Sequence, residues 1–166
     1  MIPYNTITAW GVLHPWPTRE QIEQDLLLSK AIIAIYANKT LAGELIFRGG
    51  TALHKMILQQ PCRYSEDLDF VCSMAGGIGD IMKELTELGT QSGYIVKTRM
   101  GRFPKVYWHG KTQTGRDLKI KIEINTYERS PALALVEIEH SIHTDWFSGE
   151  SMQGLWNHLK TNSTTS

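Results

Sequence analysis

The chain has 166 residues, which is long enough for one domain with a sizeable core and too short to suggest two full domains. Its 17 basic and 17 acidic residues balance, so no global electric field attracts nucleic acid or an anionic membrane, and a polynucleotide partner would need a local basic patch. No apolar run approaches the roughly 20 residues of a membrane span and no secretory signal pattern is present, so we expect a cytoplasmic protein with no membrane partner.

The first half of the chain predicts helices and strands in alternation. Residues 1–17 show no clear period, and we interpret them as a lead-in segment that lies on the surface. Thr18 and Gln21 have the spacing of a capping box, which marks the start of a helix that ends before Ala42. Three further elements then follow, a strand, a helix and a strand, over Glu44–Phe47, Thr51 to about Gln59, and a segment that ends at Val71.

A glycine pair, Gly49 and Gly50, separates the first of these strands from the helix that begins at Thr51. A strand that runs into a helix start brings unpaired backbone N–H groups to one point, where a phosphate can bind. These three residues are therefore candidate nucleotide-binding residues. The alternative is a plain strand-to-helix turn that requires small residues and nothing else.

Two carboxylates follow in the next strand, Asp67-Leu68-Asp69-Phe70. Side chains two apart in a strand share a face, so Asp67 and Asp69 project together, with Cα atoms roughly 7 Å apart at about 3.3 Å per residue. Carboxylate oxygens are ligands of Mg²⁺, which bridges them to the phosphates of a substrate. The pattern predicts a Mg²⁺ site, with Ser65 as a candidate nucleotide-binding residue that orients an aspartate. A solvated strand edge is the alternative.

The second half changes from a helical period to a period of two. After a loop at residues 73–79, one amphipathic helix spans Asp80 to about Ser92. The strands that follow are Tyr94–Thr98, Lys105–His109 and Leu118–Thr126, with a weaker candidate at Leu133–Ile138. Helices gathered early and hairpin-linked strands later predict a single α+β domain in which helices flank a mixed sheet. We expect residues 151–166 to form a disordered tail.

The segment Lys119–Asn125 alternates strictly between isoleucine and polar residues. Such alternation places a core face against a polar face. If the polar face borders the same groove as the two aspartates, Glu123 becomes a third carboxylate for the metal and Lys121 a contact for phosphate. Carboxylates this close repel one another, and a bound divalent cation is a usual reason for such a cluster. Plain solvent exposure of the charged face is the alternative.

Three motifs together resemble a known family. They are Phe-Arg-Gly-Gly-Thr-Ala-Leu at 47–53, Arg63-x-Ser65-Glu66-Asp67-Leu68-Asp69-Phe70, and the strand that ends Lys121-Ile122-Glu123-Ile124-Asn125. This set is similar to the AbiEii toxin-like nucleotidyltransferases, a branch of the polymerase-β-type superfamily. The resemblance covers about residues 18–150.

The resemblance implies a nucleotidyltransferase fold and an enzyme that uses two Mg²⁺ ions. Asp67 and Asp69 would be the metal-binding pair, Glu123 the third acidic position, and Gly49, Gly50 and Thr51 the turn that holds a nucleoside triphosphate. Such enzymes act as the toxin of a toxin–antitoxin or abortive-infection pair, so a cognate antitoxin and an RNA acceptor are implied partners.

Two alternatives stay open. Family members continue into a helical region that carries a lysine and a further acidic motif, and we expect that region to be missing here. The chain would then be a catalytically impaired remnant that binds nucleotide or an antitoxin. The second alternative is nucleotidyl transfer to a small molecule.

Overall fold

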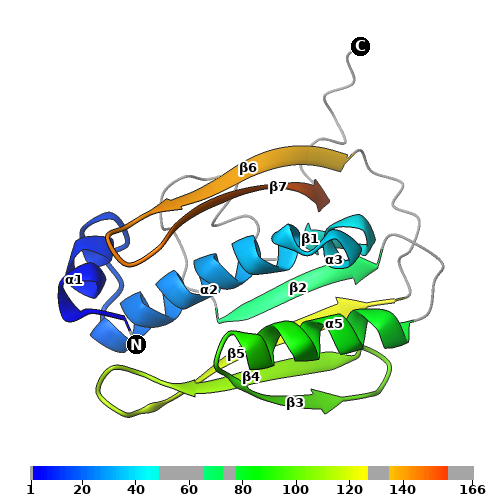
Figure 1. Cartoon of the computed structure of the whole chain (residues 1–166), viewed down its shortest axis with the longest axis horizontal. Coiled ribbons are helices and arrows are strands. Elements are labelled where there is room, and N and C mark those ends of the chain that lie inside the picture. Colours follow the sequence, from blue (N-terminus) through cyan, green and yellow to red (C-terminus); the bar gives the residue numbers. More distant parts are fainter. Residues whose placement is uncertain (1, 49–65, 73–77, 127–134, 157–166) are drawn as a thin grey trace.

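The fold was analysed in a computed structural model, which describes residues 2–48, 66–72, 78–126 and 135–156 (Figure 1). The helices are α1 (Tyr4–Leu13), α2 (Arg19–Ala37), α3 (Lys39–Glu44) and α5 (Ile78–Gln91). The strands are β1 (Leu45–Arg48), β2 (Asp67–Cys72), β3 (Ile95–Arg99), β4 (Lys105–Lys111), β5 (Asp117–Asn125), β6 (Leu135–His143) and β7 (Ser148–Trp156). The expected helix over 51–59 lies outside the described residues.

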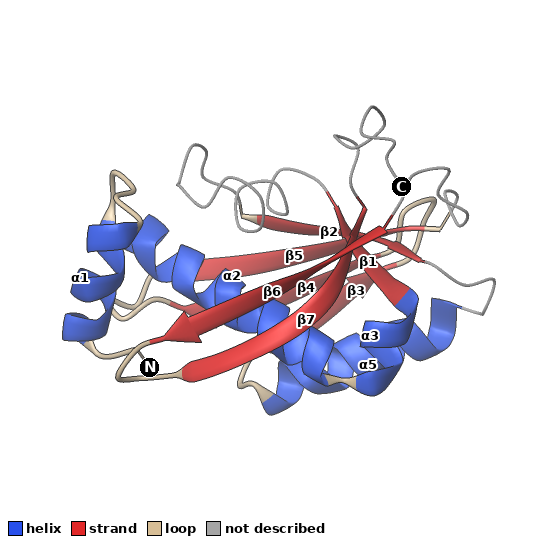
Figure 2. Ribbon diagram, turned by 90° about the horizontal axis from the view of Figure 1, so that it is seen from above, coloured by secondary structure: helices blue, strands red, loops and turns tan. Residues whose placement is uncertain are grey.

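The seven strands form one mixed sheet in the order β3-β4-β5-β2-β1-β7-β6. The pairs β2–β5 and β1–β7 are parallel and the other neighbours are antiparallel. Figure 2 shows α2, α3 and α5 gathered against one side of these strands. The α+β class with a mixed sheet flanked by helices is therefore confirmed.

The main core lies between the helices and the inner face of the sheet. Alternate residues of β2, β4 and β5 point into it, among them Leu68, Phe70, Trp108 and Ile122, which are almost completely buried. Burial of such apolar side chains is the dominant favourable term in folding. Within the described ranges, none of the helices combines the length and apolar character needed to cross a lipid bilayer.

Two expectations for the ends of the chain are wrong. Residues 4–13 of the expected surface lead-in form helix α1, whose Ile7 and Trp10 are buried against α2. This helix follows Pro3 without a side-chain cap, so the sequence carries no start signal for it. Residues 151–156 of the expected disordered tail belong to β7, which pairs with β1 and β6.

The remaining boundaries differ by a few residues. The capping box of Thr18 and Gln21 is confirmed, but the helix ends at Ala37, because Asn38 accepts a hydrogen bond from the Leu41 backbone and starts α3. The weak strand candidate at 133–138 is displaced and longer, as β6.

The contact between α5 and β4 yields a prediction about stability. Trp108 packs against Gly89 and donates an indole hydrogen bond of 3.1 Å to the Leu85 carbonyl oxygen. A Cβ atom at Gly89 would lie 2.4 Å from Trp108 Nε1, so Gly89→Ala should lower the free energy of unfolding by about 1–3 kcal/mol. The control is Gly79→Ala in the same helix, where nothing lies within 4 Å and alanine should cost nothing. Urea unfolding followed by circular dichroism measures both, and equal stability of the two variants would contradict the packing.

Candidate active site

Asp67 and Asp69 share the outer face of β2, the face turned away from the helices. Both are partly exposed, whereas Leu68, which lies between them, and Phe70, which follows Asp69, are buried. The expected projection of the two carboxylates to one side of a strand is therefore confirmed. The cause is the two-residue repeat of a strand: because Leu68 and Phe70 face the core, the residues that alternate with them face the other side.

Strand β5 brings its polar residues beside this pair. The two strands run parallel, and Asp67 is paired with Lys121 and Asp69 with Glu123. Residues paired in this way point to the same face of a sheet, so the three carboxylates and Lys121 share one surface. The expectation that the polar side of 119–125 borders the aspartates is confirmed.

Two lysines lie beside Asp67 and Glu123 and offset part of the charge of the three carboxylates. Lys121 Nζ lies 3.7 Å from Asp67 Oδ2 and 3.5 Å from Glu123 Oε2. Lys105 Nζ of β4 lies 3.8 Å from Glu123 Oε1. Burial alone would lower the pKa of Lys121, but the negative charges of Asp67 and Glu123 outweigh it, and the pKa is raised.

The donor set fits a hard divalent cation in chemical type, because carboxylate oxygens are the ligands that Mg²⁺ prefers. In the described part of the chain, however, no three His, Cys, Asp or Glu side chains converge on one point that could hold a metal ion. Lys121 takes the place between Asp67 and Glu123. The site as described is thus a face on which three carboxylates lie side by side and two lysines offset part of their charge.

Four predicted site residues lie outside the described residues: Gly49, Gly50, Thr51 and Ser65. The described chain reaches their neighbourhood at Arg48, whose Cα is paired with that of Asp69. The residue that precedes the glycine pair in the sequence therefore lies beside Asp69 in the sheet.

The sequence analysis missed the part of this face that β3 and β4 provide. Tyr107 is paired with Lys121 on one side and with Lys97 on the other, and His109 is paired with Lys119. The Tyr107 and His109 rings stack with centroids 6.1 Å apart, and Lys119 Nζ lies 5.5 Å from the Tyr107 centroid. The period-two spacing of Lys105, Tyr107 and His109 was the available signal.

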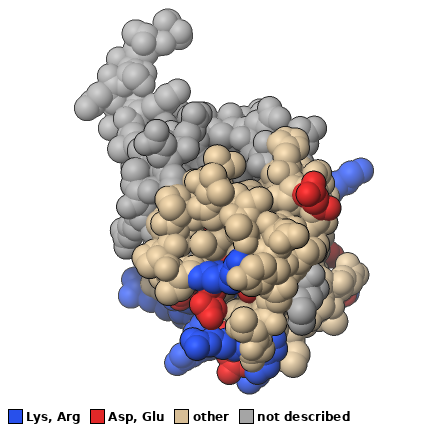
Figure 3. All heavy atoms as spheres, turned by 90° about the vertical axis from the view of Figure 1, so that its left-hand side faces the viewer, with Lys and Arg blue, Asp and Glu red and all other residues tan. Residues whose placement is uncertain are grey.

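A hollow of about 660 Å³ lies at the end of this face nearest α2, and Lys97, His109, Lys119, Gln24 and Glu66 line it. Gln24 Nε2 donates a hydrogen bond of 2.8 Å to the Lys119 carbonyl oxygen, which fixes the α2 wall of the hollow against β5. In Figure 3, which views the α1 end of the molecule, Lys and Arg side chains gather in the lower part, with acidic side chains among them.

The chain was compared with known proteins. The sequence profile of the family described as nucleotidyl transferase AbiEii toxin, Type IV TA system, matches residues 32–153. Among solved structures, MenT4, a nucleotidyltransferase toxin from Mycobacterium tuberculosis, is similar with a TM-score of 0.65 and 17% identity. The match covers 95% of this chain and 56% of MenT4, so the chain spans little more than half of that relative. No curated protein matched the sequence.

The ion pairs of Lys121 predict a small, salt-sensitive contribution to stability. Lys121→Met should lower the free energy of unfolding by under about 1 kcal/mol at neutral pH, because the partners are partly solvated. Since folding raises the pKa of Lys121 above its ordinary value of 10.5, this contribution is complete at neutral pH and is lost as the pH rises through the folded-state pKa. Urea titrations at low and high salt measure it, with Lys83→Met on the exposed side of α5 as the control. A deficit that persists in 1 M salt would argue against an electrostatic origin.

Proposed function

The chain belongs to the AbiEii family of nucleotidyltransferase toxins, and we propose that it moves a nucleoside monophosphate from a nucleoside triphosphate to an acceptor hydroxyl. The observation that carries the proposal is the alignment of Asp67, Asp69 and Glu123 on one face of two parallel strands. A similarity of fold to MenT4 agrees with this class of protein.

We propose a Mg²⁺-dependent reaction in which Asp67, Asp69 and Glu123 hold the metal. When bound, Mg²⁺ would activate the acceptor hydroxyl and neutralise the charge of the leaving phosphates. Asp67 and Glu123, which contact Lys121 here, would be among the residues that hold the ion, and the Lys121 ammonium would bind a phosphate oxygen. Lys105 stays beside Glu123 from the neighbouring strand and holds that carboxylate in position.

The reaction breaks one phosphoanhydride bond and forms one phosphoester bond. The acceptor oxygen attacks the α-phosphorus in line with the bridging oxygen that leaves, so pyrophosphate is released. The proton of the acceptor hydroxyl passes to a carboxylate of this face or to solvent. Gly49, Gly50, Thr51 and Ser65 would hold the triphosphate, as the resemblance of their motif implies.

For the acceptor we propose an RNA end. The outer face of β3, β4 and β5 offers cations around an aromatic pair, Tyr107 and His109, next to the acidic site. Phosphates attract such cations and bases stack on such rings, which is a common arrangement in proteins that bind single strands. This is the local basic patch that a chain of zero net charge needs for a polynucleotide.

We also propose that the protein is the toxin of a toxin–antitoxin pair, with a cognate antitoxin as partner and a cytoplasmic site of action. Family membership supports the toxin role.

Incubation with labelled nucleoside triphosphates, Mg²⁺ and total RNA tests the reaction. Label should enter RNA, and Asp67→Asn should reduce the rate at least about 100-fold, because the charge that holds the cation is lost. Glu87→Gln, an exposed carboxylate on α5, is the matched control and should leave the rate unchanged.

The alternatives give different products in the same assay. Label in small acceptors alone would replace the RNA proposal with small-molecule transfer. Saturable nucleotide binding without any labelled product would indicate the remnant that only binds.

The basic face makes a separate prediction that does not require catalysis. Lys97→Gln and Lys119→Gln should each weaken binding of single-stranded RNA and reduce the slope of log K against log salt by about 0.7, the value for one lost phosphate contact. Lys83→Gln, on the helix side of the molecule, is the control. Fluorescence anisotropy between 50 and 200 mM salt measures the slopes, and slopes equal to that of the unmodified protein would remove this face as the acceptor surface.

A further inference from the structure

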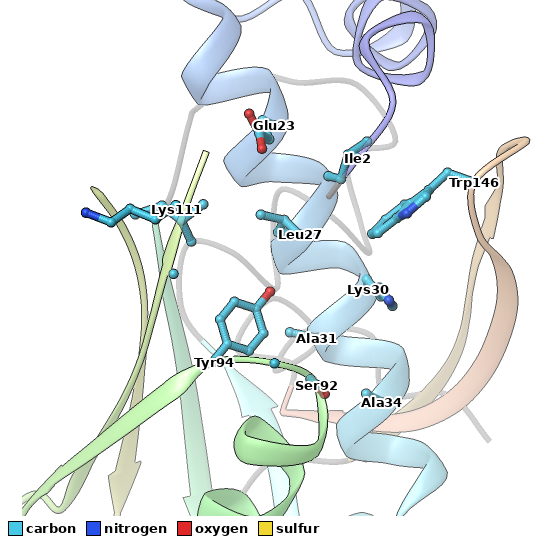
Figure 4. Close-up of a pocket in the computed structure, with 13 residues that line it drawn as sticks. Ile2, Glu23, Leu27, Lys30, Ala31, Ala34, Ser92, Tyr94, Lys111 and Trp146 are labelled. Atoms are coloured by element: carbon cyan, nitrogen blue, oxygen red, sulfur yellow. The ribbon is translucent and has the colours of Figure 1, made fainter. Parts of the chain in front are cut away.

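A second cavity lies on the helix side of the sheet, away from the carboxylates. It has a volume of about 340 Å³ and is enclosed by α2, the start of β3, the β4–β5 hairpin and the turn between β6 and β7 (Figure 4). Gly110 and Leu118 line both this cavity and the hollow of about 660 Å³, so the two share the β4–β5 hairpin as a common wall. The other lining residues lie mainly on α2 and on the turn before β3, and Asp67, Asp69 and Glu123 are not among them.

The walls of the cavity are about half apolar and half polar. Leu27, Ala31 and Ala34 of α2 form one side and Leu118 the other, with the indole of Trp146 at the β6–β7 turn. The volume falls in the range of about 300–1,000 Å³ that is typical of small-molecule sites.

Lys30 is a cation in this cavity without a carboxylate partner among the described residues. Its ammonium lies 4.5 Å from the Trp146 ring centroid and 5.0 Å from that of Phe147. Burial lowers its pKa, which means that the charged form is poorly solvated. An anion at this point would restore the interactions that the ammonium loses to burial.

Tyr94 supplies a second hydrogen-bond donor. Gly93 has a φ of 92°, and Gly110 leaves room for the phenol ring, since a Cβ there would lie 3.2 Å from it. The ring stacks on Trp108, and in Figure 4 the hydroxyl points toward α2. It makes no hydrogen bond to any described residue. Burial, reinforced by the charge of Glu23, raises the pKa of Tyr94 to about 12, so the hydroxyl keeps its proton at neutral pH.

The other charged groups at the cavity are already paired. Glu23 is almost completely buried, and both of its carboxylate oxygens accept the Gln113 backbone N–H, at 3.1 and 3.0 Å. Lys111, at the mouth, is ion-paired with Asp117. The polar groups left for a ligand are therefore two donors, the Lys30 ammonium and the Tyr94 hydroxyl.

We propose that this cavity binds an organic anion with an apolar, flat body, whose acidic group is held by Lys30 and Tyr94. The apolar body would fill the space between Leu27, Leu118 and the Trp146 indole. An inorganic anion alone would leave these walls exposed to water, and an uncharged apolar molecule would leave the Lys30 ammonium unpaired. Both parts of the ligand are thus needed.

Two dyes that differ by one acidic group test this proposal on the full chain. The anion is 8-anilinonaphthalene-1-sulfonate, and its uncharged analogue is N-phenyl-1-naphthylamine. The sulfonate should bind saturably with one molecule per chain, measured by dye fluorescence and by isothermal titration calorimetry. Lys30→Met should weaken it at least about tenfold and Tyr94→Phe about threefold to tenfold, as expected for the loss of a charge-assisted and of a neutral hydrogen bond.

The uncharged analogue should bind the unmodified protein more weakly than the sulfonate does and be unaffected by Lys30→Met, because it has no group for the ammonium. Lys83→Met is the control for a general loss of positive charge, and thermal unfolding verifies that each variant is folded. The proposal is overturned if sulfonate binding is unchanged in Lys30→Met or does not saturate near one molecule per chain. Neither result bears on nucleotidyl transfer, since the assay contains no nucleotide and neither Lys30 nor Tyr94 belongs to the proposed catalytic residues.

Discussion

The parallel register between β2 and β5 is the constraint on which the candidate active site depends. It pairs Asp67 with Lys121 and Asp69 with Glu123. The register is held from the other side of the sheet, where Leu68, Phe70, Ile122 and their neighbours are buried. A shift of one residue in β5 would turn its isoleucines to solvent and its charges into the core, so core packing fixes the position of the carboxylates.

Three consecutive buried polar residues of helix α2 form hydrogen bonds that connect it to the β4–β5 turn, to β5 and to α1. Glu23 accepts the backbone N–H of Gln113 in the β4–β5 turn, and Gln24 donates to the Lys119 carbonyl oxygen. Asp25 accepts a hydrogen bond of 2.8 Å from the Trp10 indole of α1. Buried polar groups are costly unless paired, so each of these bonds favours one placement of its element over others. Both cavities take a wall from this helix.

Sequence reasoning succeeded where one strand or helix determines its own pattern. The alternation at 67–70 and 119–125 and the capping box at Thr18 are local patterns that can be recognised in the sequence itself. It failed at β7, because that strand exists through its pairing with β1 and β6, and at α1, which is held by contacts with α2. The position of Lys105 beside Glu123 was equally hidden, since it follows from the register of β4 against β5.

A net charge of zero gave little information about the surface, because the fold sorts the charges by strand. On the outer face Asp67, Asp69 and Glu123 lie together with Lys121 and Lys105 beside them, while Lys97 lies farther away on β3 and Lys119 near the start of β5, two residues after Asp117. Opposite charges a few strands apart create a field along the sheet that their sum cannot reveal. The proposed RNA acceptor would place its phosphates over the cations of β3 and β4, and the carboxylates would repel phosphate unless the proposed cation is bound. The equal numbers of acidic and basic residues therefore do not reveal how charge is distributed over this face.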